Sequence, residues 1–179
     1  MLWKKNPSRK VVFGVREPIA RFVSGFNSRL RQGQPTHYTP WSPSEAIAFH
    51  YFKTPNELAE GLTDGNPLTK SIAEMSMWAI KHVNKPYYIA LCPLKKMKDN
   101  IDKIEFVYVV ERMQEDFKRL LPVLGINEEM ELPSDDVACH RSPEGMNKNL
   151  SPQAIENLKS WYVVDFEIYH LLSNKFSKK

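Results

Sequence analysis

An arginine at a strand-to-helix junction is the feature of this chain with the clearest chemical meaning. Residues 11–15 are an apolar run rich in β-branched side chains, which predicts a buried strand that stops at Arg16. Pro18 suits the first turn of a following helix, where its missing N–H costs nothing. Free backbone N–H groups and the helix dipole favour an anion at such a junction. The Ser24 hydroxyl, about two turns along, would add a hydrogen bond if the ligand lies along the helix.

The helix after Arg16 has one apolar stripe and one polar side. Its apolar residues recur at helical spacing and are expected to pack inward: Ile19, Phe22, Val23, Phe26 and Leu30. Its polar residues are expected to point elsewhere: Arg21, Ser24, Asn27 and Ser28. The stripe would therefore hold the helix against the protein and leave Ser24 outside the apolar core.

Strands and helices alternate along the rest of the chain. Residues 104–110 predict a second strand covered on both faces, and residues 87–91 predict a short one. Helices are predicted at residues 44–52, 54–62, 68–83, 111–124 and from 152 onward. This alternation implies an α/β sandwich with a mainly parallel sheet. Its 179 residues fit one domain spanning 1–179.

Two of these helices have an apolar pattern that predicts which residues face the core. In the helix at residues 68–83 the expected inner stripe is Leu68, Ile72, Met75, Ala79, Ile80 and Val83. In the single helix from residue 152 the expected inner stripe is Ile155, Leu158, Tyr162, Phe166 and Tyr169.

The composition narrows the class of protein and its partners. A net charge of +4 suits an anionic ligand, and the scattered cations do not form the stripe that nucleic-acid binding needs, so no nucleic-acid partner is expected. Cys92 and Cys139 are too few for a disulfide framework or a zinc site. No apolar run approaches the ~20 residues of a membrane span, and no signal peptide follows Met1. We therefore expect a cytoplasmic protein.

Three segments of the chain resemble sulfotransferases. Residues 12–26 look like the family's 3′-phosphate-binding motif, in which a strand ends in Arg-(Asp/Glu/Asn)-Pro and a helix follows with Arg and then Ser. Residues 106–120 are similar to the family's strand and the helix that begins near Glu and continues Asp-Phe. Residues 150–166 are similar to its closing helix. The resemblance points to carbohydrate-type and bacterial relatives and implies a P-loop-NTPase-like three-layer sandwich.

The resemblance also implies a ligand, 3′-phosphoadenosine 5′-phosphosulfate (PAPS) or its product 3′,5′-adenosine bisphosphate (PAP). It assigns Arg16 and Ser24 to the 3′-phosphate, and the planar donor fork of an arginine suits phosphate oxygens. Arg21 matches a further arginine of the motif, and it either contacts the ligand or anchors the helix through a salt bridge.

The polar segment at residues 127–149 is a second candidate contact with the cofactor. In many sulfotransferases a basic loop late in the chain closes over the nucleotide. Arg141, Ser142 and Lys148 are therefore candidate cofactor contacts, and the alternative is a solvated surface loop.

The activity that the resemblance implies is sulfuryl transfer to a hydroxyl of a carbohydrate or small metabolite. A base accepts the proton of the acceptor hydroxyl in such a displacement. His37, in a loop at residues 31–44, and His140 are the candidate bases, and the alternative for each is an ordinary loop histidine. The loop around His37 either lines a substrate cleft or uses Tyr38 and Trp41 to pin itself to the core. No metal is implied, and the histidines form no convincing ligand cluster.

The chain departs from the family pattern at its start. Only residues 1–10 precede the first strand, and no phosphate-cradling loop with a lysine fits there. We therefore expect an N-terminally truncated version of the fold: either a fragment, or a protein without the 5′-phosphosulfate loop. The alternative functions are a non-catalytic relative that binds nucleotide through Arg16 and Ser24, and a small P-loop kinase, against which the missing GxxxxGK[ST] stretch counts. The acceptor and the oligomeric state cannot be derived from the residues.

Overall fold

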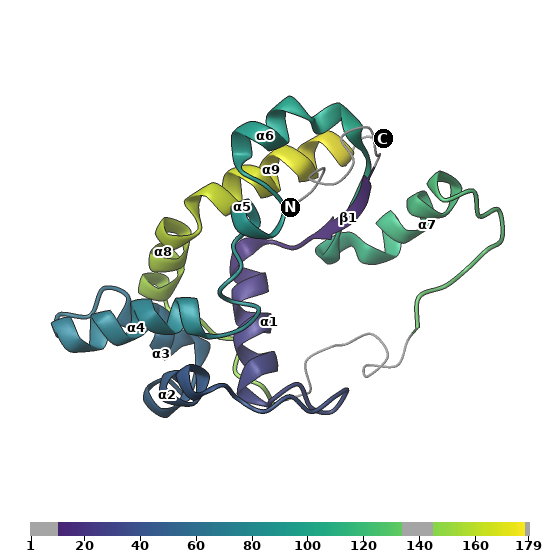
Figure 1. The fold of residues 1–179 in the computed structure, drawn as a ribbon. Coiled ribbons are helices and arrows are strands. Elements are labelled where there is room, and N and C mark those ends of the chain that lie inside the picture. The colour runs from purple at the N-terminus through teal and green to yellow at the C-terminus, as the bar shows by residue number, and fades with distance from the viewer. Residues whose placement is uncertain (1–10, 134–144, 178–179) are drawn as a thin grey trace. The chain divides into compact units, whose positions relative to one another are not determined.

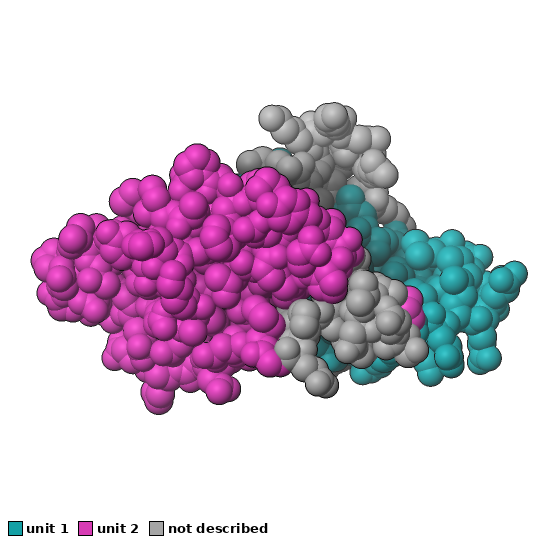
Figure 2. Space-filling view, turned by 90° about the horizontal axis from the view of Figure 1, so that it is seen from below, with its two compact units in different colours: residues 1–18, 86–132, 163–179 teal, residues 19–85, 133–162 magenta. Residues whose placement is uncertain are grey.

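The computed structural model describes residues 11–133 and 145–177. The chain divides into two compact units, coloured separately in Figure 2. Unit 1 comprises Met1–Pro18, Pro86–Leu132 and Val163–Lys179, and unit 2 comprises Ile19–Lys85 and Pro133–Tyr162. The fold is mixed α/β, with a small parallel sheet and mostly helices. None of the helices within the described ranges is long and apolar enough to cross a membrane.

The sheet of unit 1 pairs the two strands with the strongest sequence signal. β1 (Val11–Val15) lies parallel to β2 (Ile104–Val109), with Val15 opposite Val109 (Figure 1 labels β1). Both predicted strands and their parallel direction are confirmed, but β1, which was expected to be buried, is buried only at Val15 and is exposed at Val12. Gly14 lies opposite Tyr108, and a Cβ at Gly14 would come within 2.1 Å of the Tyr108 ring, so a larger residue there would require that ring to move.

Helices cover the strands of unit 1. α7 (Met113–Val123) and α9 (Val163–Phe176) both contact β2, and α5 (Tyr87–Ala90) and α6 (Leu94–Asp99) pack against α9. Short 3₁₀ turns at Ile101–Lys103 and Val110–Arg112 flank β2. The fully buried apolar core between these elements is Val15, Tyr87, Cys92, Met97, Ile104, Val107, Val109, Ile168, Leu172 and Phe176. Burial of this apolar surface is what holds the strands and helices of unit 1 together.

The strand predicted at residues 87–91 is wrong. Those residues form the single helical turn α5, between Pro86 and Pro93. The backbone N–H of Tyr87 donates to the Asp165 carboxylate at 2.8 Å. In a strand, the same N–H would have to donate to a neighbouring strand of the sheet. A contact with a distant helix therefore overrides the local strand preference of this aromatic run.

A buried carboxylate connects β2 to the helix that follows it. Asp116 is fully buried and accepts from the backbone N–H of Val109 at 2.7 Å. Arg119 donates to its other oxygen at 2.8 Å, which compensates its charge. These contacts fix the start of α7 next to the end of β2.

Unit 2 is helical, and its helices begin where cap residues precede proline. α2 (Pro43–Tyr51), α3 (Pro55–Gly61), α4 (Pro67–Ala79) and α8 (Pro152–Trp161) follow the caps Ser42, Thr54, Asn66 and Ser151. Each cap oxygen accepts a backbone N–H of the first turn, and proline needs no such partner. α1 (Pro18–Leu30) also begins at proline, and its residues from Ile19 onward belong to this unit.

Aromatic side chains form much of the core of unit 2. Phe22 and Phe26 of α1 are buried, as predicted, and Phe26 lies edge-on against Phe49 of α2. Asn27, which was expected to point outward, is buried as well.

The predicted inner stripe of α4 is wrong at its first positions. Leu68 and Met75 are 65% and 68% exposed, while Ala73 and Met77 are buried. Both sets of residues recur at helical spacing, so the pattern permits either face. Contacts of α4 with α2 and α3 select the face that contains the small Ala73.

The single helix predicted from residue 152 is two helices, α8 and α9, separated at Tyr162. Tyr162 leaves the helical conformation with φ −102° and ψ 23°. In α9 the buried position after Tyr162 is Asp165, and the predicted Phe166 is only partly buried. A carboxylate with a specific partner, the Tyr87 N–H, thus takes a core position that apolar periodicity cannot predict.

Candidate functional site

The carboxyl ends of β1 and β2 bring Arg16 and Glu111 together in unit 1. Arg16 follows β1 and Glu111 follows β2, and parallel strands present these ends at one edge of a sheet. Glu111 Oε1 accepts the Glu17 backbone N–H at 3.0 Å and lies 3.9 Å from Arg16 Nε. Each of the two side chains of this ion pair is 37% exposed, so solvent and solutes reach the guanidinium.

Tyr87 holds the backbone of Arg16 at this edge. The Arg16 N–H donates to Tyr87 Oη at 2.7 Å, and the same hydroxyl donates to the Arg16 carbonyl at 2.6 Å. The position of Arg16 thus depends on a buried side chain of α5 as well as on the end of β1.

Tyr169 of α9 belongs to the same charged surroundings. Burial raises the pKa of its phenol, and the negative charges of Glu111 and Glu17 raise it further against the opposing effect of Arg112. The phenol therefore stays protonated at neutral pH and is a hydrogen-bond donor rather than an anion.

In unit 2, a buried amide attaches the segment that carries Lys148 to α1. Asn27 Nδ2 donates to the Asn147 carbonyl at 2.8 Å, and the Asn27 side chain lies three residues after Ser24. Residues three apart share a helix face, so the segment next to Lys148 lies over the Ser24 side of α1. Lys148 itself is exposed.

Arg21 makes contacts within unit 2. Its guanidinium donates to the Lys85 carbonyl at 2.8 Å and lies over the Tyr162 ring, 5.7 Å from the centroid. These contacts anchor α1 through a backbone carbonyl and an aromatic ring, and the salt bridge that was one of the two predicted roles stays a prediction. A contact between Arg21 and ligand stays a prediction.

His37 lies exposed in the loop between α1 and α2. Gly33 has φ +85°, and a Cβ there would lie 2.7 Å from the His37 carbonyl, so the histidine packs against a position that only glycine fits. Trp41 pins this loop, because its Nε1 donates to the Arg29 carbonyl at 2.6 Å and its ring lies 5.0 Å from that of Phe49. His140, Arg141 and Ser142 lie outside the described residues.

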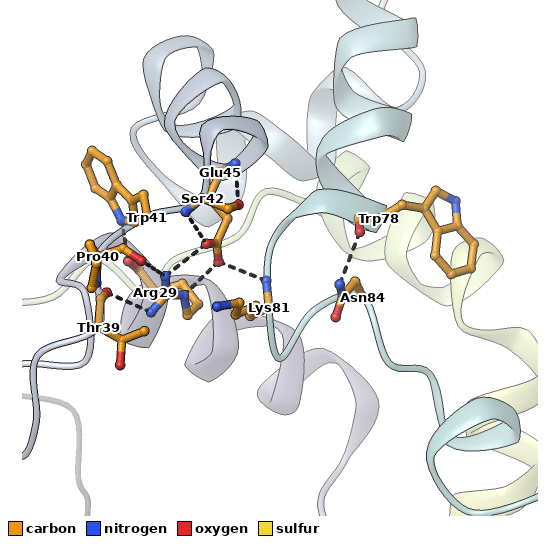
Figure 3. A network of polar contacts seen from close by, with 9 residues as sticks. All are labelled: Arg29, Thr39, Pro40, Trp41, Ser42, Glu45, Trp78, Lys81 and Asn84. Atoms are coloured by element: carbon orange, nitrogen blue, oxygen red, sulfur yellow. Dashed lines mark hydrogen bonds and ion pairs between the residues drawn. The ribbon is translucent and has the colours of Figure 1, made fainter.

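A buried ion pair supports the same loop (Figure 3). Arg29 donates to both carboxylate oxygens of Glu45 at 2.7 and 2.9 Å, and the two side chains are 2% and 0% exposed. The guanidinium also donates to the carbonyls of Thr39 and Pro40, each at 3.2 Å. Ser42 and Lys81 donate backbone N–H groups to Glu45, so one carboxylate ties α1, the loop and α2 together.

The free energy of unfolding is expected to decrease as the pH is lowered, in two separate pH ranges. Burial alone would raise the pKa of Glu45, but the bonds from Arg29, Ser42 and Lys81 outweigh it and lower the pKa from 4.5 to about 2. Since the unfolded state binds this proton more readily, up to about 3 kcal/mol of stabilisation is lost as the pH falls from 4.5 towards 2. Burial, with the nearby cations, lowers the pKa of His82 below 6.5, so its protonation also favours the unfolded state below that pH.

Urea unfolding followed by circular dichroism between about pH 7 and pH 3 measures both windows. Glu45→Gln should flatten the lower window, while a loss of stability below pH 6.5 persists because burial is the largest cause of the lowered pKa of His82. An unchanged pH slope in Glu45→Gln would contradict this assignment.

No cluster of His, Cys, Asp or Glu that could hold a metal ion occurs in residues 11–133 and 145–177. Cys92 is free and buried in the core of unit 1, where burial raises the pKa of its thiol.

Three residues that hold the Arg16 junction in place were not predicted from the sequence: Tyr87, Glu111 and Asp165. A tyrosine that binds a backbone 71 residues away has no local sequence signal. Glu111 could have been found, because it directly follows the second strand and parallel strands place their carboxyl ends together.

Comparison with known sequences identifies the family. Residues 5–171 match a sequence model of the sulfotransferase family. Nothing among the curated proteins or the solved structures matches the chain significantly.

Proposed function

Since the chain belongs to the sulfotransferase family, we propose that it transfers a sulfuryl group from PAPS to a hydroxyl of a carbohydrate or small metabolite. The observation that carries this proposal is Arg16, a half-exposed guanidinium at the carboxyl ends of two parallel strands. The 3′-phosphate is the part of the nucleotide that we assign to it.

The groups around Arg16 suit a phosphate. At 3.9 Å its pairing with Glu111 is longer than a hydrogen bond, so a phosphate can compete for the guanidinium. The Ser24 hydroxyl would add a hydrogen bond, as the family motif implies. Arg21 and Lys148 are further proposed contacts, together with Arg141 and Ser142 outside the described residues.

In the proposed reaction, PAPS supplies the sulfuryl group and the chain supplies positioning and a base. Binding through the 3′-phosphate orients the nucleotide for in-line transfer. His37 is the proposed base within the described residues, and His140 is the alternative. The base accepts the proton from the acceptor hydroxyl as the new bond between that oxygen and sulfur forms. The bond between sulfur and the 5′-phosphate oxygen breaks in the same step, and PAP leaves with that electron pair.

The proposal extends to the fold and the setting of the protein. We assign the β1–β2 pair to the parallel sheet of a P-loop-NTPase-like three-layer sandwich, with residues 1–179 acting as one sulfotransferase-like domain. Contacts of α7 and α9 with β2 support this assignment.

The free thiol of Cys92 supports a cytoplasmic location, which cell fractionation tests. Scattered cations argue against a nucleic-acid partner.

Transfer of labelled sulfate from PAPS to a panel of glycans and small alcohols tests the activity. Labelled product with the wild-type chain, lost in Arg16→Ala, is the expected result. A silent panel together with intact PAP binding would instead support a non-catalytic relative that only binds nucleotide.

Removing the negative charge of Glu111 should strengthen nucleotide binding. Its carboxylate lies beside Arg16 and takes the Glu17 N–H, so it repels and competes with an incoming phosphate. We expect Glu111→Gln to bind PAP about 5-fold more tightly, which corresponds to about 1 kcal/mol. Isothermal titration calorimetry measures this change.

Glu115→Gln is the matched control, because it removes the same charge from an exposed position of α7. Equal effects of Glu111→Gln and Glu115→Gln, or weaker binding by Glu111→Gln, would contradict the proposed competition.

A further inference from the structure

Arg16 lies in a gap of the backbone hydrogen-bonding pattern. β1 ends at Val15 and α1 begins at Pro18, so neither the ladder nor the helix includes Arg16. Its N–H and its carbonyl are both paired with one atom, Tyr87 Oη, at 2.7 and 2.6 Å. A neutral hydroxyl can do this because it donates one hydrogen bond and accepts others.

Tyr87 is itself held firmly. Its side chain is 5% exposed within the core of unit 1, and its backbone N–H donates to Asp165 at 2.8 Å. Asp165 is 1% exposed on α9. A continuous series of contacts thus runs from α9 through Tyr87 to the backbone of Arg16, buried at Asp165 and part-buried at Arg16.

We propose that Tyr87, supported by Asp165, is the positioning residue for the Arg16 guanidinium, and so sets the affinity for the 3′-phosphate. This inference rests on the proposed function, because it concerns the same phosphate. A guanidinium binds phosphate through paired, directional donors, so a small displacement of its backbone costs affinity. Tyr87 touches no ligand in this account and acts only through Arg16.

Phenylalanine at position 87 keeps the ring in the core and removes the hydroxyl. Both Arg16 backbone groups then lose their partner, and the junction is free to shift. We expect Tyr87→Phe to weaken PAP binding about 10-fold, equal to about 1.4 kcal/mol, and to change binding of 5′-AMP, which lacks the 3′-phosphate, very little.

A double-mutant cycle with Arg16→Ala separates positioning from general structural damage. If Tyr87 acts through Arg16, then Tyr87→Phe costs no further PAP affinity once Arg16 is alanine. Tyr88→Phe, at the exposed neighbouring position of the same turn, is the control and should bind PAP like wild type.

Each outcome has a distinct meaning. The same loss from Tyr87→Phe with and without Arg16, or no loss at all, would overturn the positioning role. Absence of PAP binding by the wild-type chain would instead refute the proposed function itself. If Tyr87→Phe does not fold, Asp165→Ala replaces it in the cycle and is expected to lower PAP affinity only when Arg16 is present.

Discussion

Replacing Glu45 by alanine should lower the free energy of unfolding by about 3–5 kcal/mol, the largest stability effect that we expect of a single substitution. The change leaves the Arg29 guanidinium, 2% exposed, as a buried charge without its carboxylate. It also removes the acceptor for the Ser42 and Lys81 N–H groups. The Arg29 guanidinium, which also binds the Thr39 and Pro40 carbonyls of the loop that carries His37, would lose the carboxylate that orients it, so unfolding should begin at lower urea concentration.

The exposed pair of Lys159 and Glu156 provides the control. Its N–O distance is also 2.7 Å, but the side chains are 54% and 67% exposed. Glu156→Ala should therefore cost at most about 1 kcal/mol. Chemical denaturation of both variants measures the two changes in the free energy of unfolding. Similar decreases would mean that the buried network stabilises the protein no more than a surface ion pair.

Replacing Arg16 by alanine should weaken PAP binding about 100-fold, a loss of about 3 kcal/mol, because a charge-assisted, forked contact with phosphate is removed. Little change in folding is expected, since the side chain is 37% exposed and the Tyr87 contacts involve only the backbone of Arg16.

Lys98→Ala removes the same unit of positive charge from an exposed position of α6 and is the control for general electrostatic attraction. Its PAP affinity should stay within about 2-fold of wild type. Equal losses in Arg16→Ala and Lys98→Ala would mean that the cationic surface, and not a site, attracts the nucleotide.

The sequence predicts those parts of this fold whose cause is local. The starts of α3 and α8 each depend on residues that are close together in the sequence. Thr54 and Glu57 form a capping box for α3, and Ser151 precedes Pro152 at the start of α8. The two strands are equally explicit in the sequence, because their β-branched runs have no competing helical pattern.

Features with distant causes are the ones that the sequence does not predict. Residues 87–91 have the aromatic composition of a strand, yet Asp165, 78 residues away, takes the N–H of Tyr87. In α4, Leu68 and Met75 share the helical period of Ala73 and Met77, and only packing against α2 and α3 decides which face is buried.

The residues of the candidate site also fall into those that the sequence predicts and those that it does not. The place of Arg16 follows from its own strand, turn and proline, so the sequence predicts it. Glu111 and Tyr87 reach that junction from 94 and 71 residues away, and pairing of the strands is what brings them there. Ser24 stays a prediction from the family motif.

Calorimetric titration of the wild-type chain with PAP and with 5′-AMP tests the central claim most directly, because the two ligands differ only by the 3′-phosphate. The proposed role of Arg16 predicts that PAP binds at least about 50-fold more tightly than 5′-AMP and that Arg16→Ala removes most of this difference. Equal affinity for the two nucleotides, or a preference for PAP that survives in Arg16→Ala, would contradict it.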